Sequence, residues 1–155
     1  IMHKYILFFL IIFSENKIFA HCQIPCGIYD DALRILQIKE DFNTINKAMD
    51  KIIELSQYSD ETSHNQLTRW VIAKEDHASN IQKIISEYFL TQRIKETNQK
   101  YIEQTTILQR ILVTAMKCKQ NLEKDNINKG LNLITSFSEV YFDAHGLEHL
   151  EKIEN

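Results

Sequence analysis

Residues 31–55 read DALRILQIKEDFNTINKAMDKIIEL, and their apolar side chains recur every three or four positions. That spacing places them along one face of a helix. Asp30 or Asp31 is suited to cap the start of this helix, since short polar side chains accept hydrogen bonds from its first backbone N–H groups. The apolar face comprises Ile35, Ile38, Phe42, Ile45, Met49, Ile52 and Leu55. The stretch therefore predicts one long amphipathic helix.

Three more apolar stripes with helical spacing follow, and short polar stretches separate them. The chain has only one proline and three glycines, so it lacks the turn residues typical of an all-β fold. Asp60 or Ser63 is suited to cap the second helix. The stripes run over residues 67–89, 101–122 and 127–144, with the last helix ending near Gly146. We predict an all-α fold, an up-down-up-down four-helix bundle.

Residues 1–20 have the pattern of a cleaved signal peptide. Lys4 gives a basic start, an apolar run extends from Tyr5 to Phe13, and the small residue Ala20 precedes the expected cut. The alternative is a retained hydrophobic anchor, but the run is shorter than the roughly 20 residues needed to span a bilayer. We therefore expect a signal peptidase to release a chain that starts at His21 and is not stably inserted in a membrane.

The remaining residues, 21–155, have the length of a single domain. Removal of residues 1–20 leaves 16 basic and 20 acidic side chains, a formal charge of −4. A nucleic-acid binder is expected to carry a strongly basic face, so this charge argues against nucleic acid as a partner.

The new N-terminal stretch, HCQIPCGIYDD at residues 21–31, contains two of the three cysteines and the only proline. After cleavage, the amine and imidazole of His21, the Cys22 amide and the Cys22 and Cys26 thiolates are available as ligands. Planar nitrogen and sulfur ligands suit nickel(II) or copper(II), whereas a tetrahedral set suits zinc. Cys118, in contrast, falls on an apolar stripe and is expected to be a small buried hydrophobic residue.

The pattern His-Cys-x-x-Pro-Cys-Gly-x-Tyr-Asp at residues 21–30 resembles the nickel hook of the nickel-containing superoxide dismutase family. This resemblance implies a four-helix bundle that assembles as a homohexamer. It also implies an antioxidant oxidoreductase that converts superoxide to oxygen and hydrogen peroxide through a Ni(II)/Ni(III) couple. One nickel ion per subunit would be held by His21, Cys22 and Cys26, and Tyr29 would stand over the open face of the metal.

The sequence departs from the family pattern around this hook. Gln23 replaces an aspartate, and residues 68–77 resemble the segment that carries an arginine near the axial imidazole, but His77 occupies the arginine position. The expected carboxylate has no clear equivalent, since Gln37 occupies the nearest position. The resemblance implies that three further residues surround the metal ligands: His77, Glu75 and Tyr88. Tyr88 is equally well explained as a core residue.

Two other functions use the same residues. Cys22 and Cys26 could form a disulfide in a secreted helical binding module, or the loop could serve an exported nickel or copper carrier without turnover. The leader predicts a periplasmic or extracellular location, and trimming by a dedicated cytoplasmic peptidase is the alternative. The sequence His145-Gly-Leu-Glu-His149 matches the order of a zinc-peptidase motif, but the chain offers no room for a distant further ligand.

Overall fold

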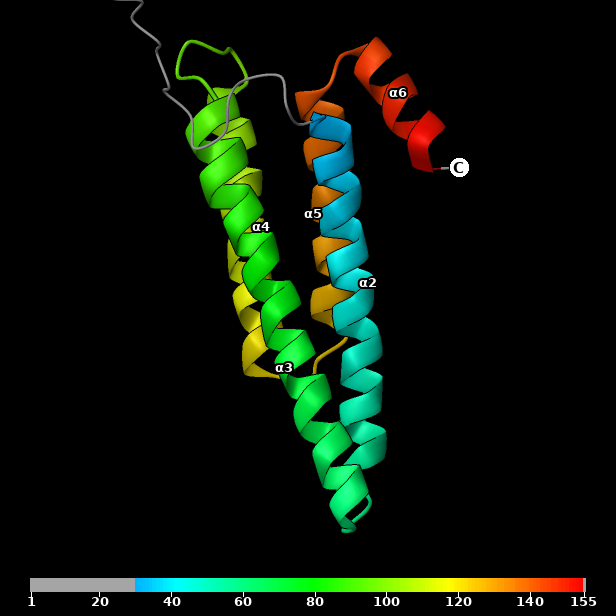
Figure 1. Ribbon diagram of the computed structural model, residues 1–155. Coiled ribbons are helices and arrows are strands. Elements are labelled where there is room, and N and C mark those ends of the chain that lie inside the picture. The colour runs from blue at the N-terminus through cyan, green and yellow to red at the C-terminus, as the bar shows by residue number, and fades with distance from the viewer. Residues whose placement is uncertain (1–29, 155) are drawn as a thin grey trace, which may run out of the picture.

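The computed structural model of the chain describes residues 30–154, which form five α-helices and one π-helical segment with no strand among them. The predicted all-helical fold is therefore confirmed. The elements are α2 (Asp31–Leu55), α3 (Glu61–Lys83), η1 (Ile84–Arg93), α4 (Tyr101–Gln120), α5 (Asp125–Tyr141) and α6 (Ala144–Glu154) (Figure 1).

The first two helices begin at aspartates that lie directly before them. Asp30 Oδ1 accepts a hydrogen bond of 2.8 Å from the backbone N–H of Ala32 at the start of α2. Asp60 Oδ1 accepts one of 3.0 Å from the N–H of Ser63 at the start of α3. Of the two predicted capping residues in each pair, the one closer to the N-terminus is therefore the cap in both helices.

The second predicted helix changes its hydrogen-bond register near its end. α3 continues without a break into η1, where bonds join residues five positions apart, as in the 2.9 Å bond from the Ile94 N–H to the Phe89 carbonyl. The side chain of Gln92 also reaches back five positions, to the Glu87 carbonyl, over 3.0 Å. An α-helix separates residues five apart by about 140° around its axis, given 3.6 residues per turn. The wider π turn brings them nearly into line.

Residues 30–154 contain one helix more than the four predicted. Instead of one helix ending near Gly146, α5 ends at Tyr141, Phe142 adopts an extended conformation, and α6 follows. Asp143 Oδ1 accepts a 2.8 Å hydrogen bond from the Gly146 N–H, so this glycine lies in the first turn of α6. Leu150 is only 5% exposed and ties α6 to the core.

The core lies between the long helices. α2 packs on α3 and α5, α4 packs on the same two helices, and α6 packs on α2. Among the largest fully buried side chains are Phe42, Phe89, Phe137, Ile35, Ile38, Ile45, Met49, Ile81, Ile85, Leu108, Ile111 and Ile134. Within residues 30–154, no helix combines the length and the apolar character needed to cross a membrane.

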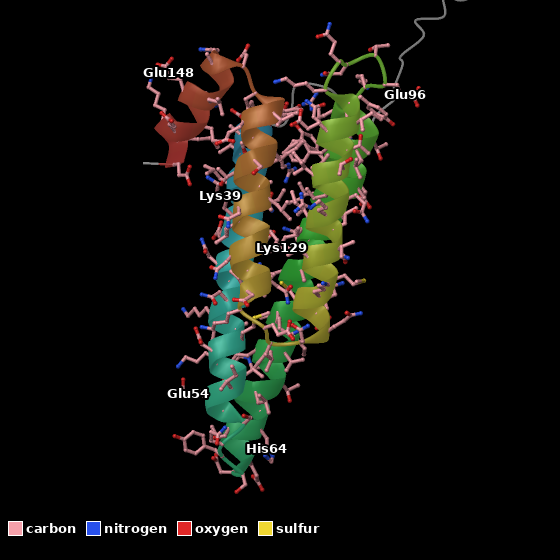
Figure 2. The ribbon with its side chains drawn as sticks, turned by 180° about the vertical axis from the view of Figure 1, so that it is seen from behind. Lys39, Glu54, His64, Glu96, Lys129 and Glu148 are labelled. Atoms are coloured by element: carbon pink, nitrogen blue, oxygen red, sulfur yellow. The ribbon has the colours of Figure 1, made fainter. Side chains whose placement is uncertain are left out.

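α2 and α3 extend well beyond the ends of α4 and α5 (Figure 1). An ion pair between Asp50 of α2 and Lys124, which precedes α5, marks the level at which the shorter helices meet. Figure 2 shows Glu54 and His64 near the far tip, opposite the end of the molecule that carries Glu96 and Glu148. Residues 51–73 therefore form a projecting hairpin, the name used for them below.

Candidate metal centre

The predicted ligands His21, Cys22 and Cys26, together with Tyr29, lie outside the described residues. Asp30 follows Tyr29 directly, so the start of α2 marks the point where the predicted loop joins the helices. Between residues 30 and 154, no group of three or more His, Cys, Asp or Glu side chains is arranged to hold a metal ion. The described helices instead carry polar clusters, beginning at the start of α2.

The carboxylate of Asp31 joins three elements at this end of the molecule. Tyr88 of η1 donates its hydroxyl to Oδ1, and Tyr141 of α5 donates to Oδ2 over 2.7 Å. Arg93 Nε forms an ion pair with Oδ1 at 2.9 Å. Arg93 also donates to the Tyr88 hydroxyl over 2.8 Å, and its guanidinium carbon lies 4.9 Å from the centroid of the Tyr88 ring.

Both tyrosines are held in the protonated form. Burial raises the pKa of Tyr88, and its hydrogen bond to Asp31 raises it further. The same two causes raise the pKa of Tyr141 strongly. Since each hydroxyl has a single proton and gives it to Asp31, the oxygen of Tyr88 faces Arg93 as an acceptor.

Asp30 connects the same end of α2 to α6. Its Oδ2 lies 2.6 Å from His149 Nε2, while its Oδ1 caps the helix. Burial acts to raise the pKa of Asp30, but the hydrogen bonds from His149 and the Ala32 N–H outweigh it, so the pKa lies below its ordinary value. His149 therefore pairs with a carboxylate, as does Lys39, which contacts Glu154 at 2.7 Å.

His77 meets a carboxylate that the sequence reasoning did not identify. Its Nδ1 lies 2.6 Å from Asp41 Oδ1, and Asn80 donates to Asp41 Oδ2 over 2.7 Å. Asp41 is almost fully buried, and burial raises its pKa although both hydrogen bonds oppose that shift. Gln37, one turn earlier, accepts from Arg34 over 2.6 Å instead.

The structure does not bring together the three residues predicted to surround the metal, which are His77, Glu75 and Tyr88. Tyr88 lies beside the start of α2, whereas His77 lies beside Asp41, ten residues or about 15 Å along that helix. Glu75 accepts from Lys74 Nζ over 2.8 Å.

The side chain of Lys74 caps the C-terminal end of α4. Its Nζ donates to the carbonyls of Cys118 and Lys119 over 2.8 and 2.6 Å, and the residue is only 4% exposed. Cys118 is a free thiol in the core, as predicted, and burial raises its pKa to about 11.

Sequence reasoning missed Asp31, Asp41, Arg93 and Tyr141 as parts of these clusters. Asp41 carries a visible signal, because a carboxylate stands beside Phe42 within a stripe of core residues. The Asp31 cluster has no such signal. Its members are up to 110 positions apart, and the contact of Arg93 with Tyr88 lies within the π segment, where α-helical spacing does not apply.

The comparisons with known proteins agree with the pattern of the N-terminal loop. The family model for nickel-containing superoxide dismutase matches residues 16–145, a range that includes residues 21–31 and ends two residues into α6. No curated protein and no solved structure matched the chain. Because the matched range spans most of the chain, the protein belongs to the family of nickel-containing superoxide dismutases, oxidoreductases that use nickel to convert superoxide to oxygen and hydrogen peroxide.

Proposed function

We propose that this superoxide dismutase binds one nickel ion per subunit in a hook formed by residues 21–29, once residues 1–20 have been removed. The amine and imidazole of His21, the Cys22 amide and the thiolates of Cys22 and Cys26 would hold the metal. The family match over residues 16–145 supports this assignment, since it includes the whole hook sequence.

The ligand chemistry fits nickel. Thiolate and nitrogen donors suit this metal in a planar arrangement. The nearest described carboxylates, on Asp30 and Asp31, are engaged by His149, Tyr88, Tyr141 and Arg93 rather than left available to a metal. Bound there, nickel would supply a one-electron couple between its two- and three-valent states. Tyr29 would screen the open face and position superoxide or water.

The pair of His77 and Asp41 is our candidate for orienting the His21 imidazole. A hydrogen-bonded carboxylate is the usual partner that fixes the ring of a metal-bound histidine. From His21 to Asp30 there are nine residue steps, which span up to about 30 Å when extended. That reach exceeds the about 15 Å from the start of α2 to Asp41. Glu75 stays a predicted neighbour of the metal site.

We propose that residues 21–155 are one domain, an up-down-up-down bundle of α2, α3 with η1, α4 and α5 that carries the hook. The contacts between consecutive helices and between α2 and α5 support this arrangement. We further propose that the subunits assemble as a homohexamer. Ile53, Val71 and Ile72 of the projecting hairpin are large apolar side chains that stay exposed in the single subunit, so they are available for a contact between subunits.

We also propose export of the protein, with cleavage by a signal peptidase and a periplasmic or extracellular location. The basic start and the short apolar run before His21 support this route. Trimming by a dedicated cytoplasmic peptidase would expose the same terminus and is the alternative.

The decisive experiment compares two forms of the mature chain, one that begins at His21 and one with a single glycine before it. The extra residue removes only the terminal amine of His21 from the ligand set. We expect the first form to bind one nickel per chain and accelerate superoxide decay, and the second to do neither. Mass spectrometry and metal analysis on the same samples provide the check, and equal activity in the two forms would contradict the hook.

The same samples separate the alternative functions. A metal carrier would bind nickel without accelerating superoxide decay. A disulfide-linked binding module would show two oxidised thiols and no nickel.

A further inference from the structure

The Asp31 carboxylate makes more contacts at the start of α2 than the capping of a helix requires. Capping is already provided by Asp30, which accepts from the Ala32 N–H. An acidic residue in the first turn is normally favourable through the helix dipole alone. The Asp31 carboxylate instead contacts Tyr88 and Arg93 of η1 and Tyr141 of α5. The start of α2 is thereby fixed to two elements that lie far from it in sequence.

The donors around Asp31 are themselves held in place. Arg93 donates to the Tyr88 hydroxyl, and the π register of η1 brings these two residues, five positions apart, to the same side of the helix. Tyr141 stacks on Phe137 with ring centroids 5.1 Å apart, and both rings contact the buried Phe89. Asp31 is therefore bound by rigid parts of the core.

The Asp31 cluster and the predicted metal loop are close together in the sequence. Cys26 precedes Asp31 by five residues, which span at most about 17 Å when extended. Wherever the loop lies, its C-terminal end is set by the position of the first turn of α2. A binding loop whose end is fixed loses less conformational freedom when it closes around its ligand.

We propose that Asp31 is the positioning residue of the nickel loop. It holds the first turn of α2 against η1 and α5, and so fixes the point at which the predicted loop joins the helices, five residues after Cys26 in the chain. This proposal rests on the proposed function of the hook. It also gives Tyr88 a defined role: its hydroxyl donates to Asp31, so Tyr88 anchors the start of α2.

The test is nickel dissociation from the mature, nickel-loaded protein into an excess of EDTA. Asp31→Asn keeps the shape of the side chain and one acceptor oxygen, but loses the charge and turns an NH2 group toward the hydroxyl donors. We expect it to release nickel at least about tenfold faster than the wild type, a change of about 1.4 kcal/mol. Asp31→Glu, which keeps the carboxylate, should recover part of the loss.

Asp50→Asn is the matched control. Asp50 also lies on α2 and is paired with Lys124, but it stands near the opposite end of the helix. We expect its nickel dissociation rate to equal that of the wild type, with urea unfolding of both variants measured in parallel. If Asp50→Asn released nickel as fast as Asp31→Asn, the effect would be one of general stability, and the proposal would fail.

A second measurement does not need the metal. In the metal-free protein, Asp31→Asn should increase amide hydrogen exchange over residues 26–33 and leave the projecting hairpin unchanged. Tyr141→Phe removes one donor with little risk to folding and should show a smaller effect of the same kind. Wild-type protein that cannot retain nickel overturns both the hook and this proposal, whereas equal nickel release and equal exchange in wild type and Asp31→Asn overturn only the role of Asp31.

Discussion

At the scale of single residues, Lys74 shows how a charge is accommodated at a helix position that otherwise belongs to the core. It lies between Val71 and Ala78, at the spacing of the apolar stripe of α3. Its amine bonds two carbonyls at the end of α4, where the helix leaves its last acceptors without partners. The residue therefore serves the packing of α3 on α4.

Replacing Lys74 with methionine should therefore destabilise the protein. Methionine fills a similar volume but leaves the carbonyls of Cys118 and Lys119 without their donor. We expect a loss of about 1–3 kcal/mol in the free energy of unfolding, measured by urea titration. Lys51→Met is the control, because Lys51 forms only an exposed pair with Glu54. Its cost should stay below about 1 kcal/mol, and equal losses in both variants would contradict the capping role.

The Cys118 thiol should be unreactive in the folded protein. Burial raises its pKa to about 11, so roughly one thiol in a thousand is ionised at pH 8. We expect a Cys22→Ser/Cys26→Ser variant, in which Cys118 is the only thiol, to react with a disulfide reagent more than about 100-fold more slowly when folded than in urea. Rapid reaction of the folded form would show that the core opens at this position.

The polar clusters between the helices could be predicted from the sequence only in part. Asp41 was recognisable as a carboxylate inside an apolar stripe, although its partner His77 was assigned through another argument. Arg93 was not recognisable, because an α-helical register turns it away from Tyr88. Patterns with helical spacing report which residues are buried, and they do not report which polar groups meet across three helices.

At the scale of elements, the stripes predicted four helices close to their observed bounds, because each buries one continuous apolar face. Two features escaped this reasoning. The π segment η1 continues the apolar stripe of α3, so its wider turns leave no mark in the spacing. α6 was missed because Gly146 resembled a helix end, whereas the Asp143 side chain bonds its N–H and places it in the first turn.

The contact between α2 and α5 depends on the absence of a side chain at Gly130. A Cβ there would overlap the ring of Phe42, which is fully buried. Gly130→Ala improves helix propensity by about 1 kcal/mol, but overpacking costs about 1–3 kcal/mol. We therefore expect thermal unfolding to show a net loss of stability.

The same substitution in a Phe42→Leu background provides the control. The smaller leucine leaves room for the new methyl group, so Gly130→Ala should there be neutral or stabilising. If Gly130→Ala cost the same in both backgrounds, the close approach of α5 to Phe42 would not be its cause.

At the scale of the whole molecule, the pair of Asp30 and His149 joins the start of the described chain to its last helix. The pKa of Asp30 lies below its ordinary value of 3.8, so this residue contributes stability above pH 3.8 and loses it as the pH falls further. His149→Gln should therefore make the free energy of unfolding less sensitive to pH below 3.8. Urea titrations across that range test it, with Glu148→Gln on the exposed side of α6 as control, and parallel pH profiles for wild type and His149→Gln would contradict the pairing.

The projecting hairpin has a practical consequence for work with this enzyme. Its turn at Gln57 is exposed and lies at the other end of α2 from Asp30, about 40 Å away along the helix. A small dye attached at this turn would leave the clusters around Asp31 and Asp41 untouched. The fold thereby supplies a position at which fluorescent forms can be prepared without altering the end of the molecule that carries Asp31.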